Sequence, residues 1–172
     1  MFFEFNRTVI AAALIVVSAT PAWSDECTQP TAALMFSAKT PYRETIVSPG
    51  PGGKSVTSQI VQTATTKYVE RDGRWTSLPV SSSDLVHAFN EMLKTGKMTC
   101  KRIGTEQINV QLTTKYTVRI ETEGIVTENT LWISAQNRQL KADTKVNGKQ
   151  FAVTFDYDHV QPPAGVRPVG QR

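Results

Sequence analysis

The sequence predicts an α+β protein, in which a strongly curved antiparallel sheet of about seven strands forms an incomplete β-barrel, covered by one short and one longer amphipathic helix. Three observations predict this fold. Apolar and polar residues alternate through most of the second half of the chain, as along strands with one dry and one wet face. Asp72-Gly73 and Asn147-Gly148 supply the positive φ angles of tight hairpin turns. Only residues 81–96 form a long amphipathic helix, so either the sheet curls on itself or an apolar cavity remains beneath that helix.

Residues 1–24 have the features of a secretory signal peptide. The apolar run 9–17 precedes the helix-breaking Pro21, and Ala22 and Ser24 are small residues at −3 and −1 to a cut before Asp25. The run is shorter than the about 20 apolar residues that a membrane span needs. The sequence therefore predicts a periplasmic or secreted protein after cleavage near Ser24/Asp25, without a stable membrane anchor. An uncleaved anchor is the alternative.

The remaining chain is expected to form one domain, 25–161, followed by a flexible Pro/Gly-rich tail, 162–172. The net charge of +4 is spread thinly, with no basic run longer than Lys101–Arg102, so we expect no nucleic-acid partner. The two cysteines, Cys27 and Cys100, most simply form one disulfide in an oxidising compartment. This disulfide would close a long loop and stabilise the fold by roughly 4 kcal/mol.

The first element expected after the signal peptide is a short helix, "TAALMFSAK". Thr28 or Gln29 would cap it, Pro30 suits its first turn, and Pro41 ends it. Strands dominate from this point. The segments 42–48 and 54–70 flank the turn-rich "PGPGG" and predict a hairpin, and "KYVERDGRWTSL" predicts a second hairpin around Asp72-Gly73.

The long helix is predicted by "SSSDLVHAFNEMLKTG". Ser81 and Asp84 resemble a capping box, and Gly96 stands where a helix end favours a left-handed residue. Its apolar residues fall on one stripe, with His87 off it. The stripe consists of Leu85, Val86, Phe89, Met92 and Leu93.

The second half of the chain predicts further antiparallel strands. In "INVQLTTKYTVRIE", residues 108–121, the apolar side chains occupy even positions, which predicts one long strand with a single dry face. "NTLWIS" continues the pattern. "QLKADTKV" and "KQFAVTFDY" then flank Asn147-Gly148 as a hairpin.

The ending "FDYDHV" could be half of a metal site or the polar end of a strand. Asp156 and Asp158 share one face of a strand, while His159 points to the other. The only other histidine, His87, lies on the exposed side of a helix. Because zinc needs three or four converging ligands, we interpret the segment as a strand end and predict no metal site.

Catalytic motifs are equally weak. "SPGPGGKS" is a near miss to a phosphate-binding loop, but its prolines lack amide donors and a strand-like segment follows it. Ser83, Asp84 and His87 lie close in sequence on one helix, where the Ser83 and Asp84 side chains point about 100° apart. Helix capping explains them better. We therefore predict no catalytic residues, no cofactor and no enzymatic activity.

Large apolar side chains of the predicted helix and strands are either a filled core or the lining of a ligand cavity. We take the cavity as the hypothesis. The helix would contribute one wall as a lid and the aromatic residues of the strands the other. The candidates are Leu85, Phe89, Met92, Leu93, Trp75, Tyr116, Trp132, Phe151 and Phe155.

Several phrases between residues 66 and 163 resemble a known family. "GRWTSLPV", "CKRIGTEQIN", "KYTVRIE" and the run from "LWIS" through "LKAD" to "FDYDHV" look like small periplasmic proteins of proteobacteria. Those proteins are in turn similar to the outer-membrane lipoprotein carrier and lipoprotein-sorting (LolA-like) superfamily. The resemblance implies an incomplete antiparallel barrel with helices as a lid over an apolar cavity that holds acyl chains.

Two functions follow as expectations. In the first, an exported, non-enzymatic binding protein holds a lipid, an acyl chain or another hydrophobic or amphiphilic ligand between sheet and helix. In the second, the core is filled and the surface docks on an envelope protein. A hydrolase would require a converging nucleophile and base, which the sequence does not offer.

Overall fold

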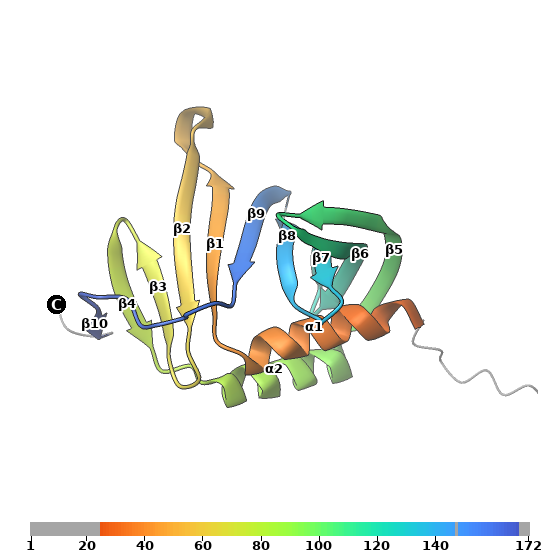
Figure 1. Ribbon diagram of the computed structural model, residues 1–172, viewed down its shortest axis with the longest axis horizontal. Coiled ribbons are helices and arrows are strands. Elements are labelled where there is room, and N and C mark those ends of the chain that lie inside the picture. Colours follow the sequence, from red (N-terminus) through yellow and green to blue (C-terminus); the bar gives the residue numbers. More distant parts are fainter. Residues whose placement is uncertain (1–24, 147, 169–172) are drawn as a thin grey trace, which may run out of the picture.

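The computed structural model describes residues 25–146 and 148–168, so the predicted signal peptide, 1–24, lies outside the described residues. Two helices, α1 (Thr28–Lys39) and α2 (Ser82–Thr95), lie side by side beneath the strands (Figure 1). Short 3-10 turns cover Asp25–Cys27 and Pro51–Gly53. The strands are β1 (Tyr42–Pro49), β2 (Ser55–Gln62), β3 (Lys67–Arg71), β4 (Arg74–Leu78), β5 (Lys97–Ile108), β6 (Gln111–Thr122), β7 (Ile125–Ser134), β8 (Gln139–Val146), β9 (Lys149–Asp156) and β10 (Arg167–Pro168).

The strands form one sheet in the order β10-β4-β3-β2-β1-β9-β8-β7-β6-β5. All adjacent strands in this order are antiparallel except the first pair, in which the two-residue β10 is parallel to β4. The sheet curves over the helices (Figure 1), so the predicted α+β class with a curved antiparallel sheet is confirmed. The number of strands is higher than the predicted seven.

Three differences account for the extra strands, of which the first is the two-residue β10. The expected strand 54–70 is interrupted at Thr63–Thr66, where the Thr63 amide and hydroxyl both donate to the Thr66 carbonyl, 2.9 Å away in each case. The chain turns there and separates β2 from β3. Strand β5 was not predicted because most of its side chains are exposed, so it has no apolar period.

The expected single strand 108–121 corresponds to β6 from Gln111 onward, whereas Ile108 ends β5 and the next two residues turn the chain. Asn109 adopts a left-handed conformation (φ 55°) and, with Val110, forms the turn between β5 and β6. Val110 is 93% exposed and Leu112 68% exposed, whereas Tyr116 and Val118 are buried. The predicted dry face is therefore correct from Tyr116 onward and wrong before it.

Helix α1 begins differently from the prediction. Its N-cap is Cys27, which makes no side-chain cap hydrogen bond, and Gln29 lies inside the helix. The side-chain amide of Gln29 instead donates through Nε2 to the Ser134 carbonyl (3.3 Å) and accepts through Oε1 from the Tyr116 hydroxyl (2.7 Å). The predicted Cys27–Cys100 disulfide is confirmed, and it joins this helix start to β5.

Helix α2 has the predicted capping box. The Ser81 hydroxyl accepts from the Asp84 amide (3.2 Å), and the Ser81 amide donates to the Asp84 carboxylate (2.7 Å). Gly96 does end the helix, but with extended rather than left-handed backbone. Its need for glycine is steric: an added Cβ would lie 2.7 Å from both the Met92 carbonyl oxygen and the Thr122 hydroxyl.

The core lies between α1 and the adjoining face of β5–β9, called the inner face below. Ala33 and Cys27 pack there against buried side chains that are cross-strand neighbours. These are Cys100, Val118, Tyr116, Leu131, Ile133, Ala142 and Val153. The side chains of alternate residues point to the opposite, outer face.

The C-terminal segment returns to the sheet. Because β9 adjoins β1 while β10 adjoins β4, the chain after Asp156 crosses β1–β4 before pairing Arg167 with Thr76 (Figure 1). Flexibility of 162–172 remains a prediction, since 169–172 lie outside the described residues. Among the described helices, neither is long and apolar enough to cross a membrane.

Candidate functional site

An apolar pocket of about 380 Å³ lies between the two helices and the sheet. Its helical wall comes from α1 and α2, and its sheet wall from β1 and β9, with one residue at the start of β8. This volume falls in the roughly 300–1,000 Å³ range of small-molecule pockets. The lining residues are Leu34, Ser37, Ala38, Tyr42, Glu44, Leu85, Ala88, Phe89, Met92, Gln139 and Phe155.

The apolar stripe of α2 is only half-buried. None of the five stripe residues reaches full burial, and no residue of this helix does. The helix packs on α1, and three of its stripe side chains, Leu85, Phe89 and Met92, line the pocket. An amphipathic helix normally gains its stability by burying such a stripe. Here the stripe lines the pocket and leaves it unfilled.

Aromatic rings form one end of the sheet wall. The Tyr42 ring centroid lies 5.8 Å from that of Phe155 and 6.3 Å from that of Tyr157. The Tyr157 hydroxyl donates to the Gln139 carbonyl (3.2 Å) and lies 2.8 Å from the Ser37 hydroxyl. Burial raises the pKa of the Tyr157 hydroxyl, and these hydrogen bonds offset part of the rise.

Glu44 is the one charged residue among those that line the pocket. Burial raises the pKa of its carboxyl above the usual range, and the Lys67 charge offsets part of that rise. Burial, followed by the negative charge of Glu44, raises the pKa of the neighbouring Tyr42 hydroxyl. The sheet wall therefore contains a carboxyl group that the surrounding apolar side chains disfavour in its ionised form.

The structure brings four of the predicted site residues together at this pocket: Leu85, Phe89, Met92 and Phe155. The other five do not line it. Leu93 is half-buried on α2, and Trp75 is half-buried on β4. Tyr116 belongs to the core, and Phe151 packs against that core.

Trp132 points to the outer face. Its neighbours across the strands are Lys115 and Lys141, whose Nζ atoms lie 4.6 Å and 4.2 Å from the centroid of its ring. The indole Nε1 donates to the Glu106 carboxylate (2.8 Å). These long side chains cover the indole, so Trp132 is only 3% exposed although it lies outside the core.

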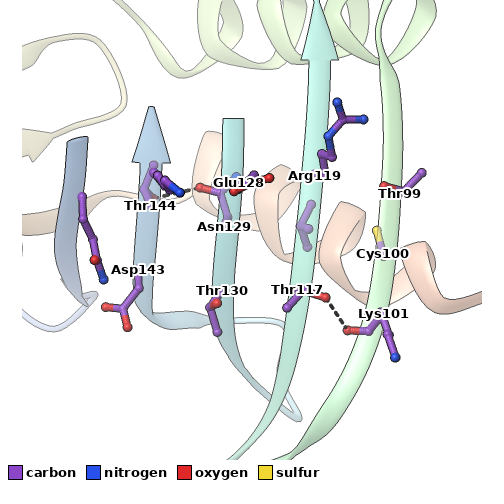
Figure 2. Close-up of a pocket in the computed structure, with 13 residues that line it drawn as sticks. Thr99, Cys100, Lys101, Thr117, Arg119, Glu128, Asn129, Thr130, Asp143 and Thr144 are labelled. Carbon is purple, nitrogen blue, oxygen red and sulfur yellow. Dashed lines mark hydrogen bonds between the residues drawn. The ribbon is translucent and has the colours of Figure 1, made fainter. Parts of the chain in front are cut away.

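A polar pocket of about 540 Å³ lies on β5–β9, lined mainly by outer-face side chains (Figure 2). Side chains of opposite charge are neighbours across the strands there. Arg119 is paired in register with Glu128, and Glu128 with Lys145. Such cross-strand charge pairs are usual on a solvated sheet face, so this pocket is not our candidate. Figure 2 also shows the Thr144 hydroxyl donating to the Asn129 side-chain oxygen (2.8 Å), and the register neighbours of these two residues, Phe151 and Val118, lie on the inner face.

The segments considered for catalysis and metal binding take structural roles. The Ser83 hydroxyl lies 2.7 Å from that of Ser81, and Asp84 belongs to the capping box. The Asp156 carboxylate accepts from the Asp158 amide (2.9 Å). Among residues 25–146 and 148–168, no three His, Cys, Asp or Glu side chains cluster as metal ligands would.

Sequence reasoning missed the pocket residues of α1 and β1. For Tyr42 and Glu44 a signal exists, because they are two apart in "YRETIVS" and therefore share a face. Leu34 and Ala38 are four apart on one helix, which also places them on one face. No signal marks Gln139.

No known protein family matches this chain, and no curated protein matches it in sequence. Solved structures do match. LprF from Mycobacterium bovis has a TM-score of 0.46 at 12% identity, over 78% of this chain and 95% of that chain. The Mycobacterium tuberculosis lipoprotein LppX has a TM-score of 0.47 at 14% identity, over 80% and 99%.

A third match is a LolA superfamily protein from Nitrosomonas europaea, NE2245, with a TM-score of 0.28 at 9% identity, over 74% of this chain and 89% of that chain. It carries the name of the superfamily that the sequence motifs resemble. All three TM-scores lie below 0.5.

Proposed function

We propose that the protein is a non-enzymatic binding protein that holds a hydrophobic or amphiphilic ligand, such as a lipid or an acyl chain, in the pocket between α1, α2 and the sheet. The observation that carries the proposal is the half-buried stripe of α2, which borders a pocket of about 380 Å³. An apolar chain in this pocket would cover Phe89 and Met92 on one side and Phe155 on the other. Burial of each CH₂ group contributes about 0.8 kcal/mol.

A charge at the centre of the helical wall tests this proposal. Phe89→Asp should lower the affinity for N-phenyl-1-naphthylamine, an apolar fluorescent probe, at least about tenfold, because the pocket would have to desolvate a carboxylate. Asn90→Asp is the matched control, since it adds the same charge one residue away on the exposed side of the helix. Circular dichroism establishes that both variants fold. Equal affinity of folded Phe89→Asp and the parent protein would contradict the proposal.

Native mass spectrometry of protein purified without detergent provides a second measurement. Co-purified mass that organic extraction removes and that is identified as lipid supports the binding function. A bare polypeptide that takes up no added amphiphile, whether fatty acid, phospholipid or alkylamine, contradicts it.

Docking on an envelope protein is the second candidate function, and the β5–β6 hairpin favours it. Val110, at the turn, is 93% exposed and Leu112 is 68% exposed, and exposed neighbouring apolar side chains often mark a protein contact. A photo-crosslinking amino acid at Val110 should then capture one defined partner in cells, and Val110→Lys with Leu112→Lys should abolish the capture of that partner by a crosslinker placed at Gln111. No defined crosslink would contradict this function.

A further inference from the structure

The carboxyl group of Glu44 lies in an unusual place for a charged side chain. Glu44 belongs to β1, a central strand, and its register neighbours are Ile60 on β2 and Phe155 on β9. Across the pocket lie the apolar side chains of α2. Glu44 is half-buried there, and moving a carboxylate out of water is costly unless it is paired and hydrogen-bonded. Its oxygens are still accessible from the pocket, so a bound molecule could supply the missing partner.

Within the described part of the chain, Glu44 has no partner for its charge. It makes no side-chain hydrogen bond there and no ion pair within 4.0 Å. Lys67 on β3 is the cation that acts on it, from beyond ion-pair distance. The nearby Tyr157 hydroxyl already donates to the Gln139 carbonyl. The acceptor oxygens of Glu44 thus remain available to a bound molecule.

We propose that Glu44 selects the polar end of the ligand: the pocket takes an amphiphile whose head group is an aliphatic ammonium, with this head at Glu44 and the chain along Phe89 and Met92. This inference rests on the proposed function. An N⁺–H donor to a carboxylate makes a charge-assisted hydrogen bond, about twice as strong as a neutral one. The anion of a fatty acid would instead place two carboxylates together, which is unfavourable.

Three ligands with the same dodecyl chain test the selection: dodecylamine, dodecanol and dodecanoate. Each competes with N-phenyl-1-naphthylamine at neutral pH, below the micellar concentration of the two ionic ligands and below the solubility limit of dodecanol. We expect dodecylamine to displace the probe at about tenfold lower concentration than dodecanoate, a difference of about 1.4 kcal/mol. Glu44→Gln should remove most of this preference while retaining the chain-dependent binding. Glu70→Gln, the same change on β3 outside the pocket lining, should preserve it.

The outcomes separate this inference from the proposed function. If all three ligands bind equally well and Glu44→Gln changes nothing, the pocket binds apolar chains but Glu44 does not select the head group. Tighter binding of dodecanoate than of dodecylamine also overturns the inference. If none of the ligands displaces the probe, or the probe itself does not bind, both the inference and the proposed function fail.

Discussion

The indole Nε1 of Trp132 on β7 donates a hydrogen bond to the carboxylate of Glu106 on β5, 2.8 Å away, across the intervening strand β6. Lys115, on β6, lies 3.3 Å from the same carboxylate oxygen. Three strands at the edge of the sheet are thereby connected on their outer face. The hydrogen bond from Trp132, followed by that from Lys115, lowers the pKa of the Glu106 carboxyl.

The first prediction concerns this carboxyl group. Its folded-state pKa is lowered, so it stabilises the fold above the usual glutamate pKa, and this contribution is lost as the pH falls through the lowered value. Trp132→Phe removes the donor and should raise the Glu106 pKa toward its usual range, as measured by carboxyl-carbon NMR. Lys141→Gln is the control and should raise it less, since Lys141 acts only through its charge. An unchanged Glu106 titration in Trp132→Phe would show that the indole does not contribute.

The second prediction concerns the pH dependence that Glu44 imposes on stability. Its folded-state pKa is raised, so its favourable contribution is complete below the usual glutamate pKa of about 4.3 and is lost as the pH rises through the raised value. Glu44→Gln should therefore be more stable than the parent protein at neutral pH and about equal to it near pH 4. The surrounding titratable groups, Tyr42, Lys67 and Tyr157, are the same in both proteins.

Urea unfolding at the two pH values measures this difference. The variant should show a higher midpoint only at neutral pH, with an unchanged dependence on urea concentration. A midpoint that is lower at neutral pH would mean that the ionised Glu44 has a stabilising partner.

The third prediction concerns the disulfide between Cys27 and Cys100, which closes a loop with a sequence separation of 73 residues. In the chain-entropy model, its loss should lower the free energy of unfolding by roughly 4 kcal/mol. Replacement of both cysteines by serine, followed by urea unfolding, measures the loss. Reduction of the parent protein should have a similar effect, and the double variant should not respond to the reductant. Stability within about 1 kcal/mol of the oxidised parent would contradict the prediction.

The fourth prediction concerns the close approach of α2 to β6 at Gly96. A methyl group there would meet two backbone carbonyl oxygens, that of Met92 at 2.7 Å and that of Glu121 at 3.1 Å. Gly96→Ala should therefore destabilise the protein by about 1–3 kcal/mol, as overpacking usually does. Lys97→Ala, at the exposed neighbouring position, is the control and should change stability by less than about 0.5 kcal/mol. Equal thermal midpoints for both variants would mean that the helix end shifts without cost.

The sequence predicts most of this fold because its local signals agree with each other. The capping box at Ser81, the stripe of α2 and the alternation from Tyr116 onward each specify one structure. The prediction fails where the usual sequence pattern of a turn or a strand is missing. Asn109 turns the chain without a following glycine, and β5 has no alternation because most of its side chains meet water.

The site is less predictable than the fold. The α2 stripe and Phe155 follow from periodicity and line the pocket. Trp132 does not line it, because "LWI" is apolar at three successive positions and its period does not indicate which residues face inward. Alternation along the strand places Glu44 on the same face as Tyr42, but it does not show that α2, which is distant in sequence, forms the opposite wall of the pocket.

The two ends of the described chain attach to opposite margins of the sheet. Cys27, at the start, is bonded to β5, and β10, at the finish, pairs with β4. Each edge of the sheet is therefore completed by a contact between residues that are far apart in the sequence, and such long-range contacts slow folding. A polypeptide that is synthesised N-terminus first cannot pair β10 with β4 until Arg167 and Pro168 have emerged, so this part of the sheet forms late in synthesis. A truncation before Arg167 would uncover the backbone of Thr76 and Ser77 on β4, and exposed strand edges of this kind can pair with other chains.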